Sequence, residues 1–283
     1  MGGPLDFIRL MRPVNCVMIG FAVIVGAVIG GGTVILTSPL MMLLSFMTGL
    51  TLTGSAMAIN DYYDREIDAI NEPGRPIPSG AVKPMEALAV SLVLSIFGLV
   101  ASWLTSAGNS VIAFLAWMTM IAYSTIGKRT GLPGNMMVST LISLPFIYGG
   151  ILIGGSSLKS SLLFALMAFL ANTGRELTKG IVDLEGDGAL GIRTVAVSKG
   201  AVVAARLSAI LYALAIAVSP LPLYFGLVSF WYVPFVGLTD LGLLYLSLSL
   251  IRNPSRENGR RVKNRVRLLM ISGLLGFLLG NLL

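Results

Sequence analysis

Long apolar segments alternate with short polar ones along the whole chain. Nine apolar segments can be counted, at about residues 14–31, 38–59, 85–105, 109–125, 135–154, 158–180, 201–219, 231–251 and 266–283. Each is close to the roughly 20 residues that an α-helix needs to cross a bilayer. Because lipid cannot satisfy unpaired backbone groups, such segments cross membranes as helices rather than as open sheets. The pattern therefore predicts an all-α, polytopic membrane protein with nine transmembrane helices.

The composition agrees with this pattern. Of the 283 residues, 55% are hydrophobic and only 12% are charged, whereas a soluble domain carries about 25% charged residues. A soluble enzyme is therefore excluded, and so is a nucleic-acid partner, since the net charge of +7 belongs to a mostly apolar chain. The single cysteine, Cys16, and the absence of histidine exclude a disulfide framework and metal sites built on these ligands.

The basic residues are distributed unequally between the two sides of the predicted topology. Of the 20 lysines and arginines, all but Lys159 fall beside the segments that share a side with the N-terminus. Lysine and arginine collect in cytoplasmic segments of membrane proteins. We therefore expect a multi-pass protein of the cell membrane, with the N-terminus in the cytoplasm and the C-terminus outside. The same charges would attract anionic membrane lipids.

Twelve of the thirteen acidic residues also lie on or beside the cytoplasmic side, and two clusters hold most of them. On a helix, Asp61, Asp64 and Asp68 lie within an arc of about 60°, and Asp183 and Asp187 lie one turn apart. Like charges at these spacings repel, and a hard cation such as Mg²⁺ would offset that repulsion together with substrate phosphate oxygens. The alternatives are a calcium site or a solvated acidic helix end. The candidate metal ligands are Asn60, Asp61, Asp64, Asp68, Asp183 and Asp187.

The order of the motifs is repeated after about 120 residues. The first acidic motif is followed by Arg75 and then by a Gly-Ala-Val sequence at 80–82, and the second by Arg193 and a Gly-Ala-Val sequence at 200–202. Such a repeat predicts two similar halves. We expect one transmembrane domain, residues 1–283, with four-helix halves at about 5–130 and 131–251 and a ninth helix. The two acidic motifs would face each other across a central cavity. Their carboxylates are the candidate catalytic residues, which are Asp61, Asp64, Asp68, Asp183 and Asp187.

A diphosphate beside these acids would also need cationic side chains. Arginine presents a planar fork to phosphate and lysine a point charge. The candidate diphosphate ligands are Asn60, Arg12, Lys128, Arg129, Arg175, Lys179 and Arg193. For Lys128 and Arg129 the alternative is ordinary anchoring on the cytoplasmic side. Residues 252–267 hold seven positive charges. The alternatives are a lipid-facing loop and a lid, and we expect the plain loop.

Three further polar features complete the candidates. Asn15 lies at the start of the first apolar segment and is either a gap filler or a substrate contact. Asp240 lies in the middle of an apolar segment, where a carboxylate costs about 2.5–3.5 kcal/mol and is a functional candidate by default. Tyr62 and Tyr123 offer aromatic faces that can stabilise a cation, although ordinary packing is the favoured explanation for each.

The motif Asn60-Asp61-x-x-Asp64-x-x-x-Asp68, the later Asp183-x-x-x-Asp187 and the nine apolar segments together resemble the UbiA superfamily of intramembrane prenyltransferases. The resemblance covers nearly the whole chain. The segments 60–80 and 174–187 are most similar to its archaeal branch, the digeranylgeranylglyceryl phosphate synthases of ether-lipid synthesis. The resemblance implies a Mg²⁺-dependent transfer of a prenyl group from an isoprenyl diphosphate, such as geranylgeranyl diphosphate, to geranylgeranylglyceryl phosphate.

The family pattern also implies roles for the candidate residues. The two acidic motifs would hold Mg²⁺ on the diphosphate, and an allylic cation would form in an apolar pocket between the helices. The candidates for the acceptor and prenyl pocket are Asn15, Tyr62, Tyr123 and Asp240.

Two other functions compete with this interpretation. The first is an aromatic prenyltransferase of quinone synthesis, with an acceptor such as 4-hydroxybenzoate. The second is a polytopic transporter with an ion site formed by acids, although transporter sites usually lie near the membrane midplane. All the acids here except Asp240 lie toward the cytoplasmic side.

Overall fold

The computed structural model of the chain describes residues 3–31, 37–152, 158–189 and 191–283. Within these residues the regular structure is helical throughout and no strand is present, so the all-α prediction is confirmed. The predicted end of the fifth apolar segment, at 153–154, lies outside the described residues. The helices are α1 (Pro4–Met11), α2 (Pro13–Gly31), α3 (Pro39–Asn71), α4 (Pro84–Trp103), α5 (Ala107–Thr125), η2 (Gly127–Arg129), α6 (Leu132–Leu152), α7 (Leu158–Val182), α8 (Leu184–Ala189), α9 (Val195–Lys199), α10 (Ala201–Val218), α11 (Leu221–Tyr224), α12 (Tyr232–Arg252) and α13 (Arg256–Leu282).

Local sequence explains where the long helices begin. Prolines open α2, α3 and α4, at a position where the missing backbone N–H loses no helical hydrogen bond. In contrast, α5 and α13 begin after serine caps: the hydroxyl of Ser106 accepts from the N–H of Asn109 at 3.1 Å, and that of Ser255 from the N–H of Asn258 at 3.4 Å. The second cap starts α13 at residue 256. The expectation of a plain loop over 252–267 is therefore wrong, because residues 256–267 form about three helical turns.

Long helices occupy all nine of the predicted apolar segments. By length and composition, eight helices of the described chain could cross a membrane. The remaining one, α7, is long enough but is more polar, since its second half carries Arg175, Glu176 and Lys179. The fold is that of a multi-pass membrane protein, and a ninth crossing by α7 stays a prediction.

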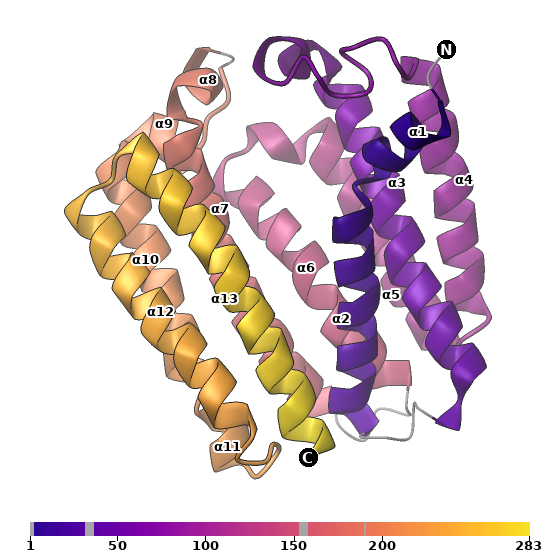
Figure 1. Ribbon diagram of the computed structural model, residues 1–283, viewed down its shortest axis with the longest axis vertical. Coiled ribbons are helices and arrows are strands. Elements are labelled where there is room, and N and C mark those ends of the chain that lie inside the picture. Colours follow the sequence, from indigo (N-terminus) through magenta and orange to yellow (C-terminus); the bar gives the residue numbers. More distant parts are fainter. Residues whose placement is uncertain (1–2, 32–36, 153–157, 190) are drawn as a thin grey trace.

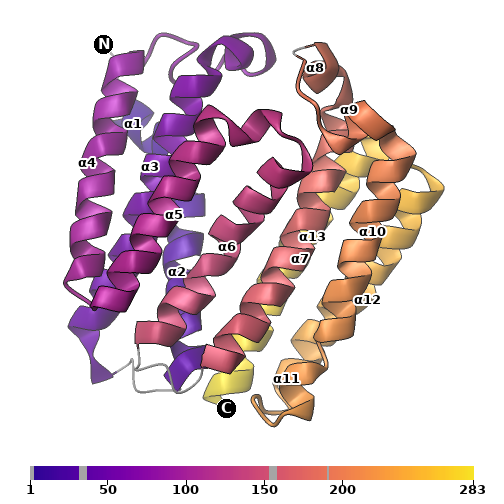
Figure 2. The same ribbon diagram turned by 180° about the vertical axis from the view of Figure 1, so that it is seen from behind.

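The long helices form a ring in chain order. Each packs against the next, from α2 through α7 to α10, α12 and α13, and α13 returns to α2 (Figures 1 and 2). On the inner side α6 also packs closely against α2. A Cβ atom added to Gly149 would lie 2.2 Å from the backbone nitrogen of Ala27, and one added to Gly30 would lie 2.6 Å from the Cα atom of Gly150. Glycines therefore permit the close backbone contact that membrane helices use. The division into two repeated halves stays a prediction.

Large apolar side chains cover the outside of the ring. Trp103 and Phe97 of α4 are 74% and 65% exposed, and Leu241 of α12 is 70% exposed. A soluble protein rarely leaves so many large side chains in water. In a membrane protein they contact lipid, which is as apolar as they are.

One end of the ring carries most of the charged side chains, and α3 is long enough to reach beyond the apolar region there. With 33 residues, α3 is about 50 Å long, whereas the hydrocarbon core of a bilayer is roughly 30 Å thick. The last turns of α3, which hold Asn60 to Asp68, lie at this end together with η2, α8 and the start of α13 (Figure 1). We call it the charged end.

Candidate active site

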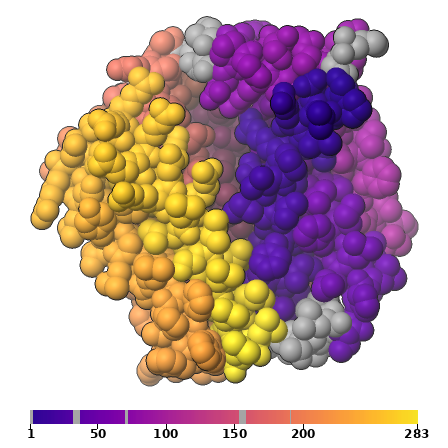
Figure 3. All heavy atoms as spheres, viewed as in Figure 1, coloured from indigo at the N-terminus to yellow at the C-terminus, as the bar shows by residue number. Residues whose placement is uncertain are grey.

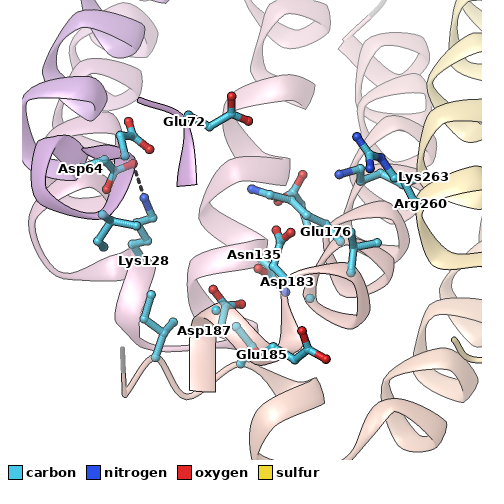
Figure 4. Close-up of a pocket in the computed structure, with 18 of the residues that line it drawn as sticks. Asp64, Glu72, Lys128, Asn135, Glu176, Asp183, Glu185, Asp187, Arg260 and Lys263 are labelled. Atoms are coloured by element: carbon cyan, nitrogen blue, oxygen red, sulfur yellow. Dashed lines mark hydrogen bonds and ion pairs between the residues drawn. The ribbon is translucent and has the colours of Figure 1, made fainter. Parts of the chain in front are cut away.

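A cavity of about 1010 Å³ opens at the charged end, and we call it the polar cavity. Figure 4 shows Asp64 and Lys128 on one side of it and two side chains of α13, Arg260 and Lys263, on the other. Elements that are far apart in sequence therefore form its walls. The residues that line it include Arg12, Asn60, Asp64, Asp68, Arg75, Tyr123, Lys128, Glu176, Lys179, Asp183, Asp187, Arg260 and Lys263.

Two aspartates of the first acidic motif face this cavity as ion pairs. Asp64 accepts a hydrogen bond from Lys128 of η2, and Asp68 accepts one from Arg75. The side-chain amide of Asn60 donates a hydrogen bond to the same Asp64 carboxylate at 2.9 Å. Both carboxylates are nearly buried, and a buried ionised carboxylate needs such partners. The α3 wall is therefore an ordered arrangement of oxygens and cations.

Asp61 lies behind this wall. Its side chain is 3% exposed; one carboxylate oxygen accepts a hydrogen bond from Arg12 at 2.5 Å and lies 3.7 Å from Arg75. Both arginines line the polar cavity, whereas Asp61 does not. Asp61 thus holds two arginines toward the cavity, and its predicted role as a metal ligand stays a prediction.

The second acidic motif forms another part of the cavity wall. Asp183 follows α7 and Asp187 lies in α8; the backbone N–H of Asp187 donates to the carbonyl oxygen of Asp183 at 2.8 Å, which is the predicted spacing of one turn. Burial, and next the neighbouring Asp183, raise the pKa of Asp187 to about 6. Nearby positive charge favours the ionised form of such a carboxyl. Below this pH Asp187 carries a proton, which it would lose on binding a cation.

The chemistry of the donors fits Mg²⁺ that arrives with a phosphate ligand. Among the described residues, no three carboxyl groups converge closely enough to hold a metal ion by themselves. Carboxylates from both motifs nevertheless line one cavity. Mg²⁺ is usually bound by one or two carboxylates and takes its other oxygens from water and substrate phosphates. Asp64, Asp68, Asp183 and Asp187, with Asn60, are the residues that would hold it.

A second cavity, of about 470 Å³, adjoins the first and is mainly apolar. Its walls come from the membrane-spanning parts of the ring and include Met18, Leu52, Trp117, Met120, Ile142 and Leu144. The two cavities share five lining residues, which are Arg12, Asn60, Tyr123, Glu176 and Lys179. The combined space suits an amphiphile with an anionic head and a long apolar chain.

Comparison with known proteins places the chain in a family. The model of the UbiA prenyltransferase family matches residues 18–274. The chain belongs to the UbiA prenyltransferase family. A curated UbiA relative, the digeranylgeranylglyceryl phosphate synthase of Methanosphaera stadtmanae, is 31% identical over 276 residues, which cover 98% of this chain and 99% of the relative.

Solved UbiA structures have the same fold. One described as digeranylgeranylglyceryl phosphate synthase in membranes has a TM-score of 0.82 at 29% identity, with 98% of both chains covered. A UbiA homologue from Archaeoglobus fulgidus bound to DMAPP and Mg²⁺ has a TM-score of 0.68 at 17% identity, with 96% of this chain and 99% of that chain covered. The predicted resemblance to this family is confirmed.

In this UbiA chain, the other predicted residues divide into two groups. Asn15 and Arg175 line the apolar cavity, and Tyr123 lines both cavities. Arg129 and Arg193 line neither of these two cavities, and both side chains are exposed. Tyr62 and Asp240 also line neither cavity. Tyr62 packs on a buried cluster that holds Leu10 and Ala58, as its packing alternative predicted.

Asp240 has a partner within the membrane-spanning region. Its carboxylate accepts a hydrogen bond from the hydroxyl of Ser219 at 2.5 Å. The Tyr232 hydroxyl donates to the Ser219 carbonyl oxygen at 2.9 Å. A polar residue inside a membrane helix needs partners of this kind. The contacts explain how Asp240 is tolerated, and its predicted place in the acceptor pocket stays a prediction.

Sequence reasoning missed several UbiA cavity residues. Arg75 was noted only as part of the repeated order of motifs, and Glu176, next to the candidate Arg175, was not singled out. Arg260 and Lys263 were missed because they lie in the segment 252–267, which was expected to be a loop. Their signal was the spacing of four and three residues that joins Arg256, Arg260 and Lys263, which places them on one helix face.

Proposed function

We propose that this protein transfers a prenyl group from an allylic isoprenoid diphosphate, geranylgeranyl diphosphate, to a hydroxyl group of geranylgeranylglyceryl phosphate in archaeal ether-lipid synthesis. The observation that carries the proposal is the continuity of the two cavities through Arg12, Asn60, Tyr123, Glu176 and Lys179. A prenyl diphosphate has the same division into a charged head and an apolar chain. The named function of the relative from Methanosphaera stadtmanae supports the choice of acceptor.

The polar cavity would bind the diphosphate. Lys128, Arg75 and Lys179 supply cations around it, and the carboxylates of Asp64 and Asp187 are among those that would hold Mg²⁺. When bound, Mg²⁺ neutralises diphosphate charge and stabilises it as a leaving group. The homologue from Archaeoglobus fulgidus bound to DMAPP and Mg²⁺ supports this cofactor.

The reaction exchanges one C–O bond for another. The bond between C1 of the prenyl chain and the diphosphate oxygen breaks, and its electron pair leaves with the diphosphate. The acceptor hydroxyl oxygen then bonds to C1, and its proton is released. Lys128 and Lys179 stabilise the negative charge that develops on the leaving group. The apolar cavity, with the ring of Trp117 in its wall, excludes water from the allylic cation and offers it an aromatic face.

We also propose that the charged end faces the cytoplasm, with the C-terminus outside. The support is the excess of lysine and arginine on this side. Cysteine accessibility tests the orientation in a Cys16→Ser background. A membrane-impermeant maleimide should label Lys159→Cys in intact cells and Arg265→Cys only after lysis. The opposite pattern would reverse the topology.

Acceptor choice is the decisive test of the function. Purified protein is incubated in detergent with Mg²⁺ and labelled geranylgeranyl diphosphate, and with either geranylgeranylglyceryl phosphate or 4-hydroxybenzoate. We expect label only in the glyceryl lipid, and none with Asp64→Ala. Label in 4-hydroxybenzoate alone would replace the proposal with an aromatic prenyltransferase. No product, together with no binding of the diphosphate, would favour a transporter.

A further inference from the structure

The start of α13 presents a stripe of four cations to the two cavities. Arg256, Arg260, Lys263 and Arg267 are spaced by four, three and four residues, so they lie within an arc of about 60° on the helix. The first three line the polar cavity, and Arg267 lines the apolar one. The α13 stripe therefore runs from the charged end to the junction of the two cavities.

Most of this charge is not neutralised by the protein. Across the cavity, Arg75 and Lys128 are each paired with an aspartate of α3. In contrast, no ion pair of the described residues includes Arg260, Lys263 or Arg267. The side chains of Arg260 and Lys263 lie on the cavity wall opposite Asp64 (Figure 4). A charged wall of this kind favours an anionic ligand.

The other cations of the same helix face elsewhere. Arg261 pairs with Glu257 at 3.5 Å on the surface, and Arg265 is exposed and lines neither cavity. These two suit contact with lipid head groups outside the protein. The separation of the two sets on one helix shows that α13 directs one set of charges inward.

We propose that Arg260 and Lys263, supported by Arg267, bind the phosphate monoester of the acceptor lipid. This inference rests on the proposed function, in which two anionic lipids must occupy the site together. The α3 and α8 walls supply the carboxylates and cations for a magnesium diphosphate. On the α13 wall Arg256 pairs with Glu185, whereas Arg260, Lys263 and Arg267 are left without an ion pair among the described residues. Arginine forms paired hydrogen bonds with phosphate oxygens.

The surroundings of the stripe also suit a lipid. Met270, one turn after Arg267, lines the apolar cavity, so a chain attached to a bound phosphate would meet apolar walls. In the space-filling view, the start of α13 and helix α2 stand on two sides of a hollow (Figure 3). A phosphate held on α13 therefore has its apolar chain beside the helices that line the second cavity.

The test compares Arg260→Gln, Lys263→Gln and their double variant with Arg265→Gln, which removes the same charge from the outward face. Prenyl transfer is measured at saturating geranylgeranyl diphosphate and Mg²⁺ while geranylgeranylglyceryl phosphate is varied. Loss of a hydrogen bond to a charged group weakens binding by about tenfold or more. We expect KM for this acceptor to rise by about that factor in each single variant. KM for the donor and kcat should stay unchanged, and Arg265→Gln should match the wild type.

A second acceptor isolates the phosphate. Geranylgeranylglycerol lacks the phosphate, so the wild type should use it poorly and the double variant should lose most of the preference. If KM for the donor, geranylgeranyl diphosphate, rose as much as KM for the acceptor, the stripe would be assigned to the diphosphate and the proposal overturned. Kinetics identical to those of Arg265→Gln would also overturn it.

Equilibrium binding separates this inference from the proposed function. Geranylgeranylglyceryl phosphate is titrated calorimetrically into the detergent-solubilised protein without donor. If the wild type makes no product from this lipid, the proposed function fails. The inference then stands only if the wild type still binds the lipid about tenfold more tightly than the double variant. It fails if the two proteins bind alike.

Discussion

Lys128 of η2 pairs with Asp64 of α3 across 64 positions of sequence, at the wall of the polar cavity. The pair joins a residue predicted to hold metal to one predicted to hold diphosphate. Each is neutralised by the other, so a magnesium diphosphate can exchange with this contact without leaving either charge unpartnered. The protein therefore keeps both groups ordered before the substrate arrives.

Replacement of Asp64 should stop catalysis while leaving the fold intact. Loss of one electrostatic contact to a developing charge commonly costs about 10²–10³ in rate. We expect Asp64→Asn to reduce prenyl transfer by about a hundredfold or more, measured with labelled donor. The matched control is Glu66→Gln on the same helix, whose side chain is 84% exposed. If Asp64→Asn were as active as Glu66→Gln, Asp64 would have no role in the active site.

Asp61 should act on the diphosphate through Arg12 and Arg75. In Asp61→Asn, Arg12 loses its carboxylate partner and Arg75 keeps only Asp68. We therefore expect KM for geranylgeranyl diphosphate to rise by about tenfold. The Mg²⁺ concentration for half-maximal rate should stay unchanged if Asp61 only positions the arginines. A strongly raised Mg²⁺ requirement would show instead that Asp61 is the metal ligand that its motif predicts.

Asp240 should be dispensable for catalysis. The amide oxygen of Asp240→Asn can accept the same hydrogen bond from Ser219 that the carboxylate accepts, so the local packing should persist. We expect kcat and both KM values of the wild type. A raised KM for the acceptor in this variant alone would support the sequence prediction that Asp240 belongs to the acceptor pocket.

The contact between α2 and α6 should be sensitive to a single methyl group. An alanine at Gly149 would place its Cβ atom 2.2 Å from the backbone of Ala27, and overpacking of this kind costs about 1–3 kcal/mol. Gly149→Ala should therefore lower the Tm in detergent. Gly237 of α12 has open space around it, so Gly237→Ala is the matched control and should not lower the Tm. A Tm of Gly149→Ala equal to the wild type would contradict the close contact.

Local sequence was enough to predict the helices and the spacing within each motif. A bilayer requires apolar segments of a minimum length, so hydropathy was enough to locate the nine long helices. Helical periodicity alone places Asp61, Asp64 and Asp68 on neighbouring turns of α3. Both are local properties, and they needed no knowledge of what packs beside each helix.

Which charged side chains meet depends on how distant segments pack together. Asp61 pairs with Arg12, 49 residues away in sequence, and Lys128 pairs with Asp64. Arg129 and Arg193 line neither cavity. Residues 256–267 became the inward-facing start of α13, because the Ser255 cap begins that helix and the ring directs one of its faces to the cavities. Ion pairs and cavity walls depend on contacts between distant segments, and positions within one segment cannot specify these contacts.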